Sequence, residues 1–240
     1  MTDIAASAAA EEHPQQEVKP HRWALAGWAR LFRRVARPFV VTRHVRRFCS
    51  PLTVEGRENF TGLRTPCLII ANHVSHFDTV IVLSLLPQAL YNRTAVVAAA
   101  DRMYRQRIKG AWLSLRYNSF PITRGGGREA LKYCHDLLAK RWSLLIFPEG
   151  KRSRTGELLP FHGGPALLAL GHEVPVLPVY IYGAADILPP GTQRSRPAAV
   201  TVRVGQPLVF RPETTIAEAK HAMEQAMRSL AQGSEASRAA

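Results

Sequence analysis

The sequence is poor in cysteine and in acidic residues, and it lacks a long apolar run. Its three cysteines, Cys49, Cys67 and Cys134, form no C-x-x-C pair, which excludes a disulfide framework and a cysteine-rich zinc module. No stretch approaches the roughly 18 apolar residues of a membrane-spanning helix. The first 20 residues are acidic and hold no apolar segment before a cleavage site. We therefore expect a cytoplasmic chain without a secretory signal or a transmembrane helix.

The shortage of acids leaves a strongly basic chain. Lys and Arg total 32 against 18 Asp and Glu, which gives a net charge of +14 over 240 residues. A surface this positive favours an anionic partner, such as nucleic acid, an anionic membrane or a phosphorylated ligand. Apolar residues make up 46% and charged residues 21%, the balance of an ordinary globular domain. The length favours one domain with a sizeable core.

Changes in composition divide the chain into four parts. Residues 1–20 are rich in Ala, Glu, Gln and Pro, which is typical of a disordered tail. Residues 21–48 contain eight arginines and no acid, and they supply +8 of the net charge. We expect residues 49–232 to form the main domain and residues 233–240 to be a frayed C-terminus.

Residues 21–48 predict basic amphipathic helices, with Pro38 ending or kinking the first. A wheel at about 100° per residue puts apolar side chains on one arc and arginines on the opposite arc. The arcs contain Leu25, Trp28, Leu31, Phe32 and Val35, and Arg22, Arg30, Arg33, Arg34 and Arg37. Arginine this dense without acid favours a helix that docks on an anionic membrane. The alternative is a helix packed on the core with its arginine face in solvent.

From residue 52 onward, short apolar runs alternate with helical periods. The expected strands are Leu52–Val54, Cys67–Ala71, Ala95–Ala99, Phe120–Thr123, Leu144–Phe147, Val176–Tyr182 and Val200–Val204. The expected helices are Ser75–Leu86, Met103–Tyr117, Arg128–Lys140, Pro165–Gly171 and Thr215–Leu230. This alternation predicts an α/β fold with a mostly parallel or mixed central sheet flanked by helices.

One histidine follows an apolar strand at the point where a turn begins. His73 lies five residues before Asp78, at the start of the next expected helix. The sequence Ser75-x-x-Asp78 has the form of a capping box, so Asp78 could simply close the helix start. Alternatively, the carboxylate could fold back onto the Nδ1 proton of His73 and leave Nε2 as a general base. The spacing alone does not decide between these two roles.

Two further strand ends carry cations next to glycine. Arg124 precedes three glycines and a helix, an arrangement that suits a bound anion but equally fits a plain connection. A Pro-Glu-Gly turn at Glu149 and Gly150 leads into Lys151 and Arg152, and an exposed turn with surface ion pairs is the simpler interpretation. In open α/β sheets, ligands bind beyond the carboxyl ends of strands, where all three turns would converge.

Taken in order, these segments resemble the four sequence blocks of the glycerolipid acyltransferases, which include the 1-acylglycerol-3-phosphate acyltransferases. The blocks here are Asn72-His73-x-Ser75-x-x-Asp78, Phe120-Pro121-Ile122-x-Arg124, Phe147-Pro148-Glu149-Gly150-x-Arg152-Ser153 and Val174-Pro175-Val176-Leu177-Pro178-Val179. The resemblance covers roughly residues 50 to 210, and the first block is the HX4D motif. Each block is short, but the ordered set is specific.

The resemblance implies transfer of a fatty acyl chain from acyl-CoA or acyl-carrier protein to a lysophospholipid hydroxyl, with 1-acylglycerol-3-phosphate as first candidate. His73 would act as general base and Asp78 would orient it. Arg124, Glu149, Gly150, Lys151 and Arg152 would bind the polar head of the acceptor. The resemblance implies no cofactor beyond the acyl donor. The sequence has no metal-ligand spacing, and its arginines lack interleaved aromatics, so we expect neither a metal nor nucleic acid as partner. Because the substrates are lipids and no spanning helix is present, we expect a peripheral position on the cytoplasmic side of a membrane.

Departures from the family pattern leave the acceptor open. Lys151 stands where the third block usually has threonine, His162 replaces a usual lysine, and Thr123 precedes the arginine of the second block. A lysophospholipid with a larger head or a lyso-amino-acid lipid is therefore an alternative acceptor. Two other functions fit the composition: a non-catalytic basic module that binds membranes or nucleic acid, and a thioesterase of the same architecture.

Overall fold

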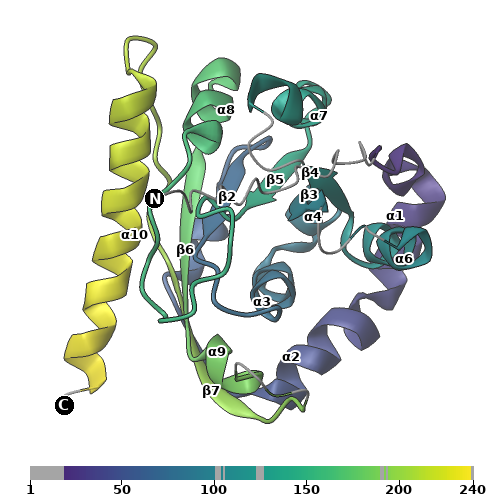
Figure 1. Cartoon of the computed structure of the whole chain (residues 1–240), viewed down its shortest axis with the longest axis vertical. Helices are drawn as coiled ribbons and strands as arrows, with labels where there is room; N and C mark the ends of the chain where they lie inside the picture. Colours follow the sequence, from purple (N-terminus) through teal and green to yellow (C-terminus); the bar gives the residue numbers. More distant parts are fainter. Residues whose placement is uncertain are drawn as a thin grey trace, which may run out of the picture.

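A seven-stranded mixed sheet forms the centre of the computed structural model (Figure 1). The structure describes residues 19–238 except 101–103, 105, 123–126, 190–191 and 193. The tail expected at residues 1–20 therefore lies, up to residue 18, outside the described residues. The strands are β1 (Cys49–Glu55), β2 (Leu68–Ala71), β3 (Thr94–Ala99), β4 (Ser119–Ile122), β5 (Ser143–Ile146), β6 (Val176–Tyr182) and β7 (Ala198–Val204).

The strand order is β1-β7-β6-β2-β5-β3-β4. Strands β6, β2, β5, β3 and β4 pair in parallel, whereas β7 runs antiparallel to β6 and parallel to β1. The predicted α/β fold with a mostly parallel or mixed sheet is confirmed. All seven expected strands form, with shifted ends, and the carboxyl ends of β2 and β5 lie side by side. This edge carries the loops that follow Ala71 and Ile146.

Helices cover both faces of the sheet. The longer ones are α1 (Gly27–Arg37), α3 (Asp78–Leu85), α6 (Arg107–Tyr117), α7 (Gly127–Ala139), α8 (Gly164–His172) and α10 (Ile216–Arg238). The short ones are η1 (Arg22–Leu25), η2 (Pro38–Thr42), α2 (Arg43–Phe48), η3 (Arg57–Phe60), α4 (Gln88–Tyr91) and α9 (Ala184–Ile187). The sequence pattern did not predict η3, α4 and α9, because a single turn is too short for a helical period.

Two apolar cores lie on opposite faces of the sheet. In β2, Ile69 and Ala71 face the core beneath α2 and α3, while Leu68 and Ile70 face the core beneath α7, α8 and α10. This alternation follows from the period of two along a strand. The β2 side chains are buried on both faces, which explains why β2 reads as a continuous apolar run.

Helix α1 packs through two of its arginines, whereas α2 fits the alternative, with Val45 buried in the core and Arg46 and Arg47 exposed. Arg33 is buried and donates to the backbone oxygens of Ala24 at 2.6 Å and of Ser114 at 3.5 Å. Burial lowers the pKa of Arg33 to about 10, so it stays charged at neutral pH. Arg37 donates to Leu86 O at 2.6 Å. The two arginines reach the carbonyl ends of α6 and α3, where helices leave unpaired oxygens and a negative dipole end.

The large apolar side chains of α1 face away from the protein. Trp28, Leu31 and Val35 are 58%, 61% and 64% exposed. As predicted, α1 ends at Arg37, directly before Pro38, and the chain continues as the π-helical turn η2. At the other end of the chain, α10 continues past Gly233 to Arg238, where a frayed end was expected. A single glycine costs a helix only about 1 kcal/mol relative to alanine.

Among the described helices, none combines the length and the apolarity that crossing a bilayer demands.

Candidate active site

The His73 loop leaves the carboxyl end of β2 and is fixed to the neighbouring strand. The buried side chain of Asn72 receives the Ile181 N–H at 2.7 Å and donates to Ile181 O at 3.0 Å. These two bonds tie the end of β2 to β6. This role of Asn72 is not apparent from the family blocks, although an amide directly after a buried apolar strand is a signal of such a backbone contact.

The structure brings the two predicted catalytic residues together. Asp78 Oδ2 lies 2.8 Å from His73 Nδ1, and the His73 side chain is 22% exposed while Asp78 is fully buried. Because a carboxylate only accepts hydrogen bonds, this contact places the neutral imidazole proton on Nδ1. Nε2 is then the ring nitrogen left to take a proton from a substrate.

Asp78 Oδ2 also accepts the backbone N–H groups of Val74 and Ser75, both at 2.8 Å. Asp78 is the first residue of α3, and the Ser75 hydroxyl accepts the Phe77 N–H at 3.3 Å. The predicted capping box does not form, because α3 begins at Asp78 itself and has no side-chain cap. The one oxygen instead holds two N–H groups of the loop before α3 together with the His73 ring. Burial raises the pKa of Asp78, and the contacts from His73 and the two N–H groups oppose that rise.

The buried carboxylate of Glu149 joins the His73 loop to the loop that follows β5. Its Oε1 accepts the His73 N–H at 2.7 Å, and its Oε2 accepts the Leu159 N–H at 3.0 Å. Only 2% of Glu149 is exposed, and burial raises its pKa. The sequence prediction placed Glu149 on the acceptor head. In the structure both oxygens are turned inward to backbone N–H groups, so the side chain braces the loop that carries His73.

Further neighbours surround the imidazole and the Pro-Glu-Gly turn. The Phe147 ring stacks on the His73 ring with centroids 4.3 Å apart, a contact that the sequence did not indicate. Gly150 has a φ of +67°, and a Cβ there would lie 2.8 Å from Nε2 of His162. His162, which departs from the family pattern, therefore lies against this turn. In addition, the Ser153 N–H donates to His73 O at 2.8 Å.

The predicted head-group residues lie at different depths. Lys151 is exposed and Arg152 is half-buried, both in the loop that wraps around His73. Arg124 lies outside the described residues, although β4, which leads to it, ends at the same sheet edge. The described residues contain no group of three or more His, Cys, Asp or Glu side chains that could hold a metal ion.

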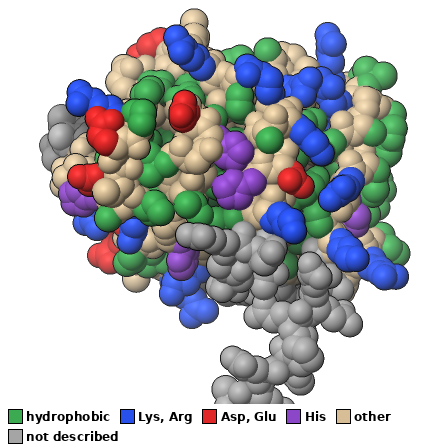
Figure 2. Space-filling view, turned by 90° about the horizontal axis from the view of Figure 1, so that it is seen from above, with side chains coloured by type: hydrophobic (Ala, Val, Ile, Leu, Met, Phe, Trp, Pro, Cys, Tyr) green, Lys and Arg blue, Asp and Glu red, His purple; other side chains and the backbone are tan. Residues whose placement is uncertain are grey.

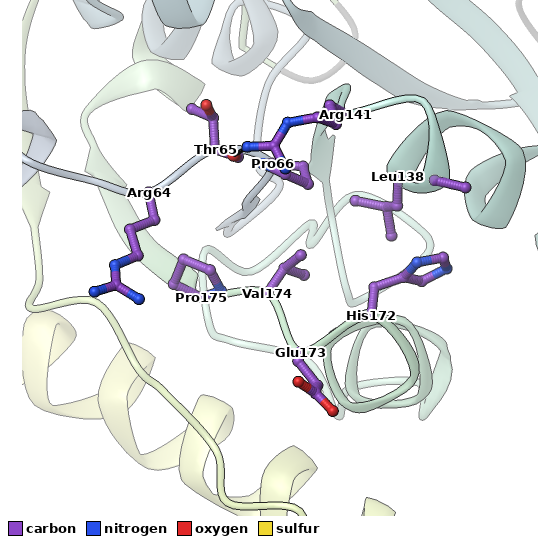
Figure 3. A pocket seen from close by; sticks show the side chains of 10 residues that line it. Arg64, Thr65, Pro66, Leu138, Arg141, His172, Glu173, Val174 and Pro175 are labelled. Atoms are coloured by element: carbon purple, nitrogen blue, oxygen red, sulfur yellow. Dashed lines mark hydrogen bonds between the residues drawn. The ribbon is translucent and has the colours of Figure 1, made fainter.

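A cavity of about 590 Å³ lies at the opposite edge of the sheet (Figure 3). Its walls include Thr65 and Pro66 before β2, Arg141 before β5, and Val174 and Pro175 before β6. Figure 3 shows Arg141 reaching toward Thr65, whose carbonyl oxygen it contacts at 2.7 Å. Because His73 follows the other end of β2, this cavity is separate from the His73 site.

The arrangement around His73 suits proton abstraction followed by acyl transfer. A histidine oriented by a buried carboxylate can take a proton from a hydroxyl as that hydroxyl attacks a carbonyl carbon. A thioester is already activated, so a positioned base and correct orientation of the reactants are the main requirements.

Comparison with known proteins assigns the chain to a family. A family model described as Acyltransferase matches residues 51–182. The chain is 31% identical over 143 residues to a chloroplastic 1-acyl-sn-glycerol-3-phosphate acyltransferase of Brassica napus, covering 58% of this chain and 40% of that protein. It is 30% identical over 181 residues to a lyso-ornithine lipid O-acyltransferase of Pseudomonas aeruginosa, covering 75% of this chain and 61% of that protein.

A solved structure shares the fold. The crystal structure of the 1-acyl-sn-glycerophosphate acyltransferase from Thermotoga maritima superposes with a TM-score of 0.61 at 24% identity, over 84% of this chain and 76% of that one. The chain spans about half the length of the curated relatives that it matches. Because the family model covers more than half of its residues, the chain belongs to the Acyltransferase family.

Proposed function

We propose that the protein transfers a fatty acyl chain from a thioester donor, acyl-CoA or acyl-carrier protein, to the hydroxyl of a lysolipid. The observation that carries the proposal is the His73 imidazole, oriented through Nδ1 by the buried Asp78 carboxylate and partly open to solvent. His73 takes the proton of the acceptor hydroxyl as its oxygen attacks the thioester carbonyl. The carbon–sulfur bond then breaks, the protonated His73 gives its proton to the departing sulfur, and the donor leaves as a free thiol.

Asp78 stabilises the imidazolium that forms when His73 accepts the proton, because the opposite charge is 2.8 Å away. Glu149 acts as a positioning residue that holds the His73 backbone. The exposed Lys151 and the half-buried Arg152, together with Arg124, supply positive charge for an anionic head group.

Lysophosphatidic acid is the first candidate acceptor, because several relatives are named for it. A lyso-amino-acid lipid is the second candidate, and two observations favour it. One relative is named for lyso-ornithine lipid and matches across three quarters of this chain. The other is that Lys151 and His162 alter the charge beside the turn that holds Glu149.

The protein works at a membrane surface under this proposal, because acceptor and product are both lipids. The N-terminal segment 21–48 is the docking element, and an anionic leaflet is its partner. Its support is the outward apolar arc of α1 together with the positive charge of the chain.

A panel of lysolipids tests the proposal. The purified protein is incubated with acyl-CoA or acyl-carrier protein and each of lysophosphatidic acid, lyso-ornithine lipid and lysophosphatidylcholine, and products are identified by mass spectrometry. We expect one acceptor to be acylated by the wild type and not by His73→Ala. Undiminished transfer by His73→Ala contradicts the assigned base. Release of free fatty acid without any lysolipid indicates a thioesterase, and tight RNA or DNA binding without lipid binding indicates a non-catalytic module.

A further inference from the structure

A second helix extends the outward apolar arc of the N-terminal segment. On α6, Ile108 is 76% exposed and Trp112 is 55% exposed, and the two lie one helical turn apart on one face. Helices α1 and α6 pack together, and Arg33 of α1 donates to the last carbonyls of α6. The exposed apolar side chains of α1, η2 and α6 are Trp28, Leu31, Phe32, Val35, Phe39, Ile108 and Trp112.

These residues make up seven of the nine large apolar side chains that are exposed in the described part of the chain; the other two, Val209 and Ile216, precede or begin α10. Helices α1 and α6 form one lateral edge of the molecule in Figure 1, and Figure 2, turned about the horizontal axis, shows apolar side chains with Lys and Arg beside them along that edge. Gathered exposed apolar residues mark an interaction surface rather than ordinary scatter.

We propose that α1, η2 and α6 together form one membrane-insertion face, to which α6 contributes Ile108 and Trp112, and that its partner is an anionic bilayer. This inference rests on the proposed function only in its choice of lipid as partner. The inference adds α6, an element of the main domain, to the docking segment 21–48. It also states that the exposed apolar side of α1, η2 and α6 enters the membrane.

Charge complementarity favours an anionic bilayer as the occupant. The exposed cations of α1, α6 and the adjoining helix α2 are Arg34, Arg43, Arg46, Arg47, Arg107 and Lys109. These side chains can reach lipid phosphates while the apolar residues enter the acyl boundary, and tryptophan is a residue typical of that boundary. No acid occurs in residues 21–48 or in α6, so these elements present no negative charge to the lipid.

The arginines that point inward explain how the face stays exposed. An amphipathic helix packed on a protein normally buries its apolar side. Here Arg33 donates to the last carbonyls of α6 and Arg37 to the carbonyl end of α3, so the opposite, apolar side of α1 has to face outward. The docking segment 21–48 also contacts the start of α3. The centroids of the Phe48 and Phe77 rings lie 5.3 Å apart, and Phe77 is next to Asp78.

Site-specific labelling tests the face directly. The three native cysteines are buried, so a cysteine introduced by Ile108→Cys, Val35→Cys or Val209→Cys can be labelled selectively with an environment-sensitive fluorophore. Val209 is the matched control, since it is 79% exposed and lies outside the face. With vesicles of phosphatidylcholine and phosphatidylglycerol in equal parts, we expect a blue shift at positions 35 and 108 and none at 209.

The outcomes separate the inference from the proposed function. A shift at 35 without one at 108 overturns the composite face and leaves docking by segment 21–48 intact. No shift at either position overturns membrane insertion, whether or not acyl transfer is detected in detergent. A shift at 108 that appears without vesicles as protein concentration rises indicates a second copy as the occupant and also overturns the inference.

A binding measurement gives the size of the effect. We expect Ile108→Ser/Trp112→Ser to weaken partition into these vesicles by at least about tenfold, because two large apolar side chains no longer leave water. Val209→Ser is expected to leave partition unchanged. Transfer to a detergent-solubilised lysolipid should remain at the wild-type rate in both variants, which separates loss of docking from loss of folding. Unchanged partition of the double variant contradicts the contribution of α6.

Discussion

Replacing Asp78 by asparagine separates its catalytic role from its structural role. Asparagine keeps an oxygen that can accept the N–H groups of Val74 and Ser75, so the start of α3 is preserved. What disappears is the negative charge 2.8 Å from His73 Nδ1. If the carboxylate stabilises an imidazolium during acyl transfer, Asp78→Asn should lower kcat much more than it lowers stability.

The size of the effect follows from the contacts. A hydrogen bond to a charged group contributes about 1.5–3 kcal/mol, which corresponds to roughly 10- to 150-fold in rate. The retained oxygen still accepts the Nδ1 proton of His73, so the tautomer is kept and only the charge is lost. We therefore expect kcat to fall by about 10- to 150-fold.

Stability should change little, because two effects oppose each other. Burial raises the pKa of Asp78, so the charged form is costly in the folded state and its removal is a gain. Against this, the new NH₂ group takes the place of Asp78 Oδ1, which is buried without a hydrogen-bond partner in the described structure. An unsatisfied donor costs about 1–3 kcal/mol.

The assay is release of free CoA with the best acceptor of the lysolipid panel, beside urea unfolding of both proteins. Asp136→Asn is the matched control, because Asp136 is exposed on α7 and loses the same charge. A wild-type kcat in Asp78→Asn would refute the reasoning. If kcat falls only together with a large loss of unfolding free energy, the role of Asp78 is structural, at the start of α3.

Three more substitutions test the contacts around the site and the docking segment. Glu149→Gln replaces one of two acceptors by an NH₂ group, and we expect kcat to fall because the His73 loop shifts, by about tenfold for one lost bond of about 1–1.5 kcal/mol. Arg33→Met should lower the free energy of unfolding by about 1–3 kcal/mol, since buried carbonyl oxygens lose their donor. Gly150→Ala should cost about 1–2 kcal/mol for the positive φ, and the new Cβ also crowds His162.

The free energy of unfolding in urea provides a check for each of these three substitutions. Because burial raises the pKa of Glu149 above its ordinary 4.5, the folded protein binds that proton more tightly than the unfolded chain. The advantage of wild type over Glu149→Gln should therefore grow as pH falls from neutrality toward 4.5, and a shrinking advantage would contradict the burial argument. Arg34→Met, an exposed neighbour with the same charge change, should leave stability unaltered. Adding His162→Ala to Gly150→Ala should restore only the part due to crowding.

Local pattern was sufficient to predict the sheet and the family. Short apolar runs such as Leu68–Ala71 favour buried strands in a chain that alternates with helical periods, and all seven expected strands form. The ordered blocks around His73 and Glu149 carried the family resemblance, because each short motif lies at a strand end. Single-turn helices such as α4 left no period to detect.

The sequence by itself determined that segment 21–48 is amphipathic and that His73 and Asp78 lie close along the chain. Only the tertiary structure decided which way α1 faces, because the carbonyl ends of α3 and α6 that hold its arginines come from distant parts of the chain. The same holds for Glu149, for which the family resemblance implied a contact with the acceptor head. Its partners His73 and Leu159 are backbone groups, which leave no trace in side-chain pattern, so folding alone showed that the carboxylate points inward.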